Sequence, residues 1–366
     1  MYKYKHHNAA FSIATSDIEN DKLRLKVGHA IDNVFKGFLK SDSNNVQFEF
    51  IFTDKIEKFI IDTDFVNVKN IKVGSTQTHF RDYELNFLID NSNPFKVIVN
   101  IIDNETIKSS LRVFNKGFAN NIEQQVSTFY YRVFLLFSQL WNTQNGLTYL
   151  HSSAVSVKGK SIIFTADSGV GKSALLFKLS QDKNFKFIAD DLTLISNKSE
   201  SFFQGRCLSV KPYHLKYFSF LSEKLKVLMG SVQKLQWKII NDNRLTYRIA
   251  PTELFDQICE KSEIKRIIHL CNYSKDTYEI KKISAVDLLG FTLSILTNEL
   301  FLLNHKLNTL ASLPNSPFIN SSVLYKTVSD IYSQAFKNIE IKLVFVPYMS
   351  DPNDLYEFLK SEGCLS

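Results

Sequence analysis

The chain has few of the features that would place it outside the cell or in a membrane. Its four cysteines, Cys207, Cys259, Cys271 and Cys364, include no two at C-x-x-C spacing, which disfavours a zinc site or a dithiol redox pair. The start of the chain lacks the apolar segment of a signal peptide. The most apolar segment, residues 288–303, is interrupted by polar residues and is shorter than the roughly 20 apolar residues of a spanning helix. These absences predict a cytoplasmic protein with reduced thiols and no membrane contact.

The sequence also lacks internal repeats, strongly polar low-complexity segments and any concentrated run of basic residues. Its 366 residues carry a formal charge of +7, spread along the chain. A mild basic excess suits anionic ligands such as nucleotides. Without a basic stripe interleaved with aromatic residues, it gives no support for nucleic-acid binding. The length predicts about two domains.

The apolar periodicity changes near residue 120 and divides the chain into expected parts. Residues 1–120 alternate apolar and polar positions, which predicts a β-rich N-terminal domain with one helix near residues 20–40. Residues 121–145 switch to helical spacing and are expected to form a connecting helix, and residues 146–366 to form an α/β domain. The predicted strands include 46–50, 83–87, 95–102, 111–113, 185–189, 237–240, 245–249, 264–270 and 339–346, and the later predicted helices are 175–179, 286–303, 321–336 and 352–359.

A glycine-rich loop lies between a predicted strand and a predicted helix of the α/β domain. Two β runs, residues 151–157 and 161–165, flank Lys158-Gly-Lys160, a pattern that predicts a hairpin. The second run leads into Ala166-Asp-Ser-Gly-Val-Gly-Lys-Ser173, which is close to the P-loop (Walker A) pattern G-x-x-x-x-G-K-[ST]. Alanine replaces the first glycine, and it fits there only if the local φ is negative.

This loop predicts a site for ATP and Mg²⁺. In such loops the main-chain N–H groups and the helix N-terminus hold the phosphates. The lysine, here Lys172, reaches the β- and γ-phosphates, and the hydroxyl, here Ser173, binds Mg²⁺. The residues expected to contact the nucleotide are Asp167, Ser168, Gly169, Val170, Gly171, Lys172, Ser173 and Ala174.

An acidic pair, Asp190-Asp191, follows the predicted strand 185–189. Ligands of open α/β sheets bind at the carboxyl ends of the strands, so both carboxylates are expected near the phosphates. One can help to hold Mg²⁺, and the other can accept a proton from the attacking hydroxyl. His151 opens the predicted hairpin, and its position fits a structural role as well as a role in the site.

Phosphoryl transfer needs more positive charge than one lysine and one metal ion supply. Basic residues that follow the acidic pair are the candidates, namely Arg206, Lys211, Arg244 and Arg248. Alternation along a predicted strand places Arg244 and Arg248 on one face, which makes this pair preferred and Arg248 the expected catalytic arginine.

Four segments together resemble the HPr kinase/phosphorylase family, bacterial P-loop kinases related to phosphoenolpyruvate carboxykinase. They are Leu150-His-Ser-Ser-Ala-Val155, the lysine-glycine turn at residues 158–160, the loop 166–173 and Ala189-Asp-Asp191. The resemblance is clear over about residues 145–195. It implies an α/β fold with a P-loop kinase core of this type, joined to the β-rich N-terminal domain. It also implies that Asp190 deprotonates the acceptor serine, that Asp191 and Ser173 serve the metal, and that His151 lies beside the active site.

The chain departs from the family after the acidic pair. The stretch Phe202-Phe-Gln-Gly-Arg-Cys-Leu-Ser-Val-Lys-Pro212 lacks the glycine-rich segment that carries a metal-binding glutamate in HPr kinases. The better match is the HPr-kinase-like group, in which some members phosphorylate a serine of a precursor peptide during biosynthesis of ribosomal peptide products such as lasso peptides. The resemblance therefore implies a kinase that acts on a serine of a peptide or protein. A kinase of a small metabolite such as free serine and a nucleotide-binding regulator without turnover are the alternatives. The oligomeric state, including a homo-oligomer, stays open.

Overall fold

The computed structural model describes residues 1–7, 9–43, 45–68, 71–81, 85–103, 121–240, 246–312, 318–348 and 350–366. The chain forms two compact units. The first comprises Met1–Trp141 and Phe301–Leu324, and the second comprises Asn142–Leu300 and Tyr325–Ser366. The helical residues that precede residue 142 thus belong to the first unit, as do residues 301–324, which the sequence placed in the α/β domain.

The first unit contains an eight-stranded mixed sheet in the order β1-β2-β3-β8-β7-β6-β5-β4. The pairs β2–β3 and β3–β8 are parallel, and the other neighbours are antiparallel. The strands are β1 Tyr2–His6, β2 Ala9–Ala14, β3 Phe48–Thr53, β4 Val66–Val68, β5 Ile71–Val73, β6 Gln77–Arg81, β7 Asn86–Asp90 and β8 Asn93–Asn100. The β-rich character and the strands expected at 46–50 and 95–102 are confirmed, and the strand expected at 83–87 begins later, at Asn86. The strand expected at 111–113 lies outside the described residues.

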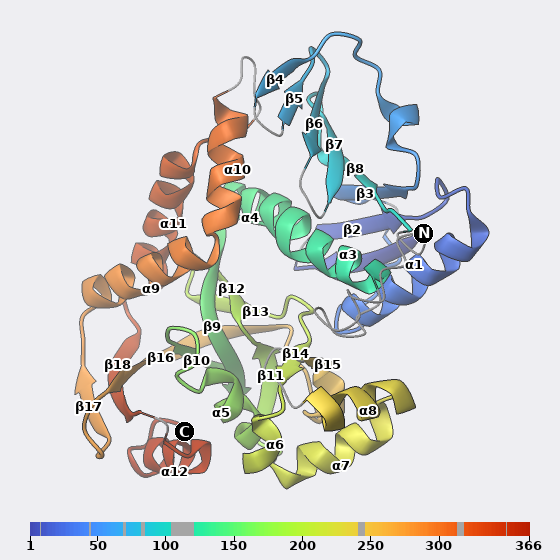
Figure 1. Ribbon diagram of the computed structural model, residues 1–366. Coiled ribbons are helices and arrows are strands. Elements are labelled where there is room, and N and C mark those ends of the chain that lie inside the picture. The colour runs from blue at the N-terminus through green and yellow to red at the C-terminus, as the bar shows by residue number, and fades with distance from the viewer. Residues whose placement is uncertain are drawn as a thin grey trace. The chain divides into compact units, whose positions relative to one another are not determined.

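The helices of the first unit include α1 Asp21–Val34, α3 Asn121–Phe129, α4 Leu135–Gln144, which reaches the unit boundary, and α10 Phe301–Ala311. A π-helical turn at Tyr130–Phe134 joins α3 to α4. The helix expected near residues 20–40 is confirmed, and Asn20 caps it by accepting a hydrogen bond from the N–H of Leu23. Phe129 packs edge-on against Phe50 and Phe52 at 4.9 Å between ring centroids. Phenylalanine packing therefore holds α3 on the sheet, and Figure 1 shows this helix beside the strands of the sheet.

In the second unit, strand pairings close into a ring. The order is β10-β9-β12-β13-β16-β18-β17, and β10 also pairs with β16, while β11 pairs with β9 beside β12. The strands are β9 Leu147–Val157, β10 Lys160–Thr165, β11 Phe185–Ala189, β12 Leu192–Ser196, β13 Glu200–Phe202, β16 Lys261–Tyr273, β17 Glu279–Lys282 and β18 Glu340–Pro347, with a small separate sheet of β14 Leu208–Val210 and β15 Tyr247–Ile249. Every residue of β9 is buried, which makes β9 the central strand (Figure 1).

The helices of this unit are α5 Lys172–Leu179, α6 His214–Tyr217, α7 Ser219–Leu228, α8 Ser231–Ile240, α9 Ala285–Glu299, most of α11 Ser321–Ala335 and α12 Pro352–Ser361. The strand predicted at residues 237–240 is wrong, because this segment ends α8. Leu235 and Ile239 are spaced by four residues on that helix and are 58% and 69% exposed, so the short apolar run did not mark a buried strand. The single helix expected over 286–303 is two helices that meet at Leu300.

No helix in the described parts of the chain combines the length and the apolarity needed to cross a membrane.

Candidate functional site

The predicted hairpin delivers the glycine-rich loop. Strands β9 and β10 pair antiparallel around Lys158 and Gly159, whose φ angles of 51° and 80° suit a two-residue I′ turn. At the other end of β10, the Thr165 hydroxyl lies 2.8 Å from Nδ1 of His269 on the neighbouring strand β16. This contact links the last residue of β10, directly before the loop, to β16.

The loop 166–171 has the backbone shape that its glycines allow. Gly169 and Gly171 have φ angles of 89° and 113°, a region that side chains with a Cβ rarely adopt. A Cβ at Gly169 would meet nothing within 4 Å, so conformation alone explains glycine there. Ala166 does not have a positive φ, so the condition on its substitution for glycine is met. Helix α5 is confirmed, but it begins at Lys172, directly after Gly171 and three residues before the start expected at residue 175.

Lys172 folds back over the loop from the first position of α5. Its ammonium group donates to the carbonyl oxygens of Ala166 at 2.8 Å and Asp167 at 2.9 Å. The side chain is buried, and burial lowers the pKa of Lys172, while nearby carboxylates led by Asp191 and Asp190 act in the opposite direction. The ammonium group of Lys172 therefore lies against the first residues of the loop. In loops of this type the main-chain N–H groups bind phosphate.

The next residue, Ser173, joins the loop to the acidic pair. Its hydroxyl donates to Oδ1 of Asp190 at 3.0 Å, and the Ser153 hydroxyl of β9 donates to the same oxygen at 2.8 Å. Asp190 is only 2% exposed. Burial, together with the neighbouring Asp191 carboxylate, raises the pKa of Asp190 despite these two hydrogen bonds.

Asp191 has a different environment. The two acidic residues occupy the break between β11 and β12, which both pair with β9, so they do not emerge at the free end of an open sheet. Asp191 has a φ of 68°, and its carbonyl oxygen accepts from the N–H of Ser152 at 3.1 Å. Its carboxylate forms an ion pair with Arg206. Partial desolvation raises the pKa of the half-exposed Asp191 carboxyl, but the charges of Arg206, His151 and Lys172 outweigh this effect and lower it.

His151 lies between two carboxylates. The side chain is 3% exposed, and within the described part of the chain neither ring nitrogen has a hydrogen-bond partner. Nδ1 is 3.8 Å from Oδ1 of Asp191, and Nε2 is 4.0 Å from Oε1 of Glu299, the last residue of α9. Glu299 also accepts from the hydroxyl of Ser168 in the loop at 3.1 Å. Burial and the charge of Lys172 lower the pKa of His151 and favour its neutral form.

The fold thus brings together most of the side chains expected from the sequence, namely His151, Lys172, Ser173, Asp190 and Asp191. Arg248 lies on β15, opposite Ser209 of β14, and its catalytic role stays a prediction. Arg244 lies outside the described residues. The ion pair at Asp191 belongs to Arg206, a candidate that strand alternation had ranked below Arg244 and Arg248.

Two further residues, Ser153 and Glu299, were missed. Ser153 is two positions after His151 on one strand, so alternation could have placed it on the same face. Glu299 follows the loop by more than 120 residues at the end of an apolar helix, and no local pattern marks it.

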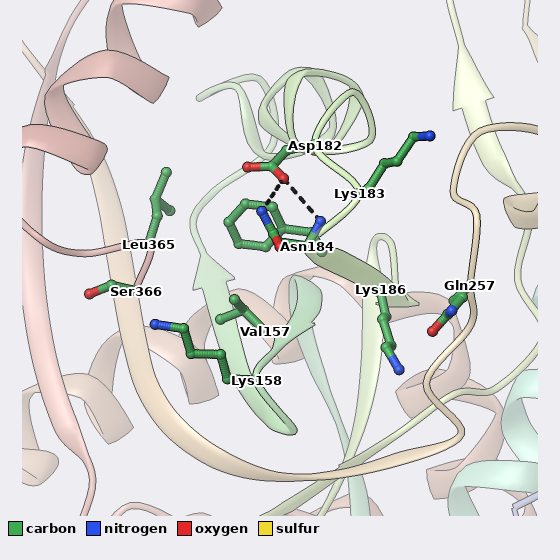
Figure 2. A pocket seen from close by; sticks show the side chains of 10 residues that line it. Val157, Lys158, Asp182, Lys183, Asn184, Lys186, Gln257, Leu365 and Ser366 are labelled. Carbon is green, nitrogen blue, oxygen red and sulfur yellow. Dashed lines mark hydrogen bonds between the residues drawn. The ribbon is translucent and has the colours of Figure 1, made fainter.

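A hollow of about 570 Å³ lies elsewhere in this unit, by the β9–β10 turn and the start of β11. Figure 2 shows that the amino groups of Lys158, Lys183 and Lys186 point in different directions around it. Asp182 accepts hydrogen bonds from the main-chain N–H and the side-chain amide of Asn184. The hollow therefore lacks the convergent polar groups that the loop region has.

Comparisons with known proteins add only a weak likeness to solved structures. No family model and no curated protein matches the chain. Among solved structures, the HPr(Ser) kinase/phosphatase from Coxiella burnetii matches with 10% sequence identity and a TM-score of 0.28, over 59% of this chain and 96% of that one. A TM-score this low does not establish a shared fold.

Proposed function

We propose that this protein is an ATP-dependent phosphotransferase that uses Mg²⁺ and transfers the γ-phosphate to a serine hydroxyl. The observation that carries the proposal is the hydrogen bond from Ser173 to Asp190. Ser173 directly follows the buried Lys172 and a loop in which two glycines have positive φ. P-loop enzymes hold Mg²⁺ with a loop hydroxyl and a carboxylate from a neighbouring strand, and this pair has that relationship.

The donor set fits Mg²⁺ bound together with phosphates. Among the described residues, no three His, Cys, Asp or Glu side chains form a metal site made by protein alone. Mg²⁺ prefers oxygen ligands and commonly keeps several waters beside one or two carboxylates and substrate phosphates. Ser173, Asp190 and Asp191 supply such oxygens. When bound, the ion would neutralise charge that develops on the transferred phosphoryl group.

The two carboxylates suit different tasks. The raised pKa of Asp190 fits a group that takes a proton from an attacking serine, because general bases work best with a pKa near the working pH. Asp191 has a lowered pKa and a side chain 41% exposed, which suits a permanent anion that orients Arg206 and the metal. Asp190 also touches Ser173, so Asp190→Asn tests metal binding as well as proton transfer.

The proposed acceptor is a serine of a peptide or protein, and a precursor peptide of a ribosomal peptide product is the leading candidate because of the sequence resemblance. A small hydroxylated metabolite such as free serine is the alternative.

The test measures transfer of label from γ-labelled ATP to candidate acceptors. We expect label on a serine-containing peptide with the wild-type protein. Lys172→Ala should lose ATP binding, and Asp190→Asn should bind ATP with no transfer. Retained ATP binding with no transfer to any peptide or metabolite would leave a nucleotide-binding regulator as the function. Undiminished transfer by Asp190→Asn would remove Asp190 as the base.

A further inference from the structure

A third carboxylate contacts the phosphate loop and has no part in the proposed chemistry. Oε1 of Glu299 accepts from the Ser168 hydroxyl at 3.1 Å and lies 4.0 Å from Nε2 of His151. Ser168 belongs to the loop itself, immediately before Gly169. Glu299 ends α9, and the chain passes into the first unit one residue later, after Leu300.

The charge of Glu299 acts on the same groups that would meet a phosphate. Burial lowers the pKa of Lys172, and Glu299 is one of the carboxylates that act against burial. The same carboxylate favours a protonated His151. Glu299 therefore adds negative charge to a region that already contains Asp190 and Asp191, and a nucleotide triphosphate would bring more.

The Ser168 hydroxyl has a single proton to donate. It can give that proton to Glu299 or to a phosphate oxygen, but not to both. We propose that Glu299 competes with the terminal phosphate of a nucleotide for the loop and thereby sets the affinity for triphosphates. This inference rests on the proposed function. If Glu299 competes in this way, its carboxylate weakens nucleotide binding more as the charge on the phosphates increases. Binding of the uncharged nucleoside should be unaffected.

The test compares three variants by calorimetry with adenosine, ADP and a non-hydrolysable ATP analogue, each with Mg²⁺. Glu299→Gln keeps an oxygen acceptor for Ser168 but removes the charge. We expect it to bind the ATP analogue about fivefold more tightly, because the carboxylate is partly exposed and its repulsion is partly screened. The gain should be smaller for ADP and absent for adenosine. Glu299→Asp keeps the charge on a side chain that is one methylene shorter, so its affinity for the ATP analogue should lie between those of the wild type and Glu299→Gln.

Glu263→Gln is the matched control. Glu263 lies on β16 of the same unit, and its side chain is 64% exposed. It is opposite Lys160, the first residue of β10, at the end of that strand away from the loop. This variant loses the same charge and should leave the affinity unchanged. The gain in Glu299→Gln should also shrink as salt concentration rises.

Equal effects on adenosine and the ATP analogue would overturn the inference, because they would show a structural role. Weaker binding of the ATP analogue by Glu299→Gln would also overturn it, since Glu299 would then assist the metal. If the wild-type protein binds no nucleotide at all, the proposed function fails. If it binds and Glu299→Gln is unchanged, only the inference fails.

Discussion

Asp190 and Asp191 are neighbours in the chain, yet they lie in opposite electrostatic environments. Burial raises the pKa of Asp190, whereas the charge of Arg206 helps to bring the pKa of Asp191 below its usual value. Titratable groups whose pKa values are pushed apart often divide acid–base and electrostatic tasks. The positive φ of Asp191 allows this separation, because it turns the backbone between β11 and β12.

Arg206 is the arginine that we expect to support catalysis. It is nearly buried, with a side chain 10% exposed, and it pairs with Asp191. Replacing Arg206 with alanine should lower kcat by about a hundredfold, as loss of a preorganised charge in an active site does. Arg248→Ala on β15 is the matched comparison. Steady-state kinetics on both variants decides between them, and a larger loss in Arg248→Ala would restore the prediction made from the sequence.

His214 predicts a pH dependence of stability. Its Nδ1 accepts from the N–H of Lys211 at 3.0 Å, and burial lowers the pKa of His214 to about 3. In the unfolded chain the pKa of His214 is about 6.5. Between about pH 6.5 and 3 this histidine is therefore protonated in the unfolded state but neutral in the folded state. Stability should therefore fall as pH decreases from 6.5 towards 3, by up to about 1.4 kcal/mol per pH unit from this group.

Unfolding by urea at pH 7, 6 and 5 measures this effect. His214→Asn should show a shallower loss of stability with falling pH than the wild type. His269, whose pKa burial lowers to about 4, adds a similar dependence that both proteins share. Parallel pH dependence in the two proteins would show that His214 is not the source.

At the level of elements, the strand, loop and helix around residues 160–179 were predictable because their signals are local. The Lys158-Gly159 turn, the glycines of the loop and the apolar run of β10 each act within a few residues. The acidic pair was predictable by position, but its location between two strands that share β9 was not, because that depends on long-range pairing.

The contacts that Arg206 and Glu299 make in the site were also not predictable, because they depend on how separate segments pack together in the fold. Alternation along a strand favoured Arg248, but the arginine that reaches Asp191 is Arg206, which lies between β13 and β14, and local alternation does not tell which segment approaches Asp191. Glu299 reaches Ser168 only through the packing of α9 in the folded unit. The ring of strands that β10 closes with β16 also joins segments about a hundred residues apart.

Alanine should have opposite effects on stability at Gly169 of the loop and at Gly290 of α9. Gly169→Ala places a Cβ at a φ of 89°, which costs about 1–2 kcal/mol, and should distort the loop and weaken ATP binding. Gly290→Ala lies within α9, where a Cβ also meets nothing within 4 Å and the backbone is helical. It should instead stabilise the fold by about 0.5–1 kcal/mol.

Thermal unfolding and ATP titration of both variants provide the measurement. Equal stability of the two variants would contradict the assigned backbone conformation of Gly169.

For the whole molecule, the proposed chemistry lies in one of two compact units. Every residue placed in the site, from His151 to Glu299, belongs to the second unit. The first unit has its own sheet and phenylalanine-rich core, and the chain enters it a second time directly after Leu300. We therefore expect nucleotide to stabilise the second unit directly, by an amount that grows with the logarithm of ligand concentration.

The most direct test of the central claim is hydrogen exchange of the main-chain amides in residues 167–173, with and without Mg²⁺ and a non-hydrolysable ATP analogue. If these amides hold the phosphates, their exchange should slow on addition of the nucleotide in the wild-type protein and stay unchanged in Lys172→Ala. Unchanged exchange in the wild type at a saturating nucleotide concentration would contradict the account.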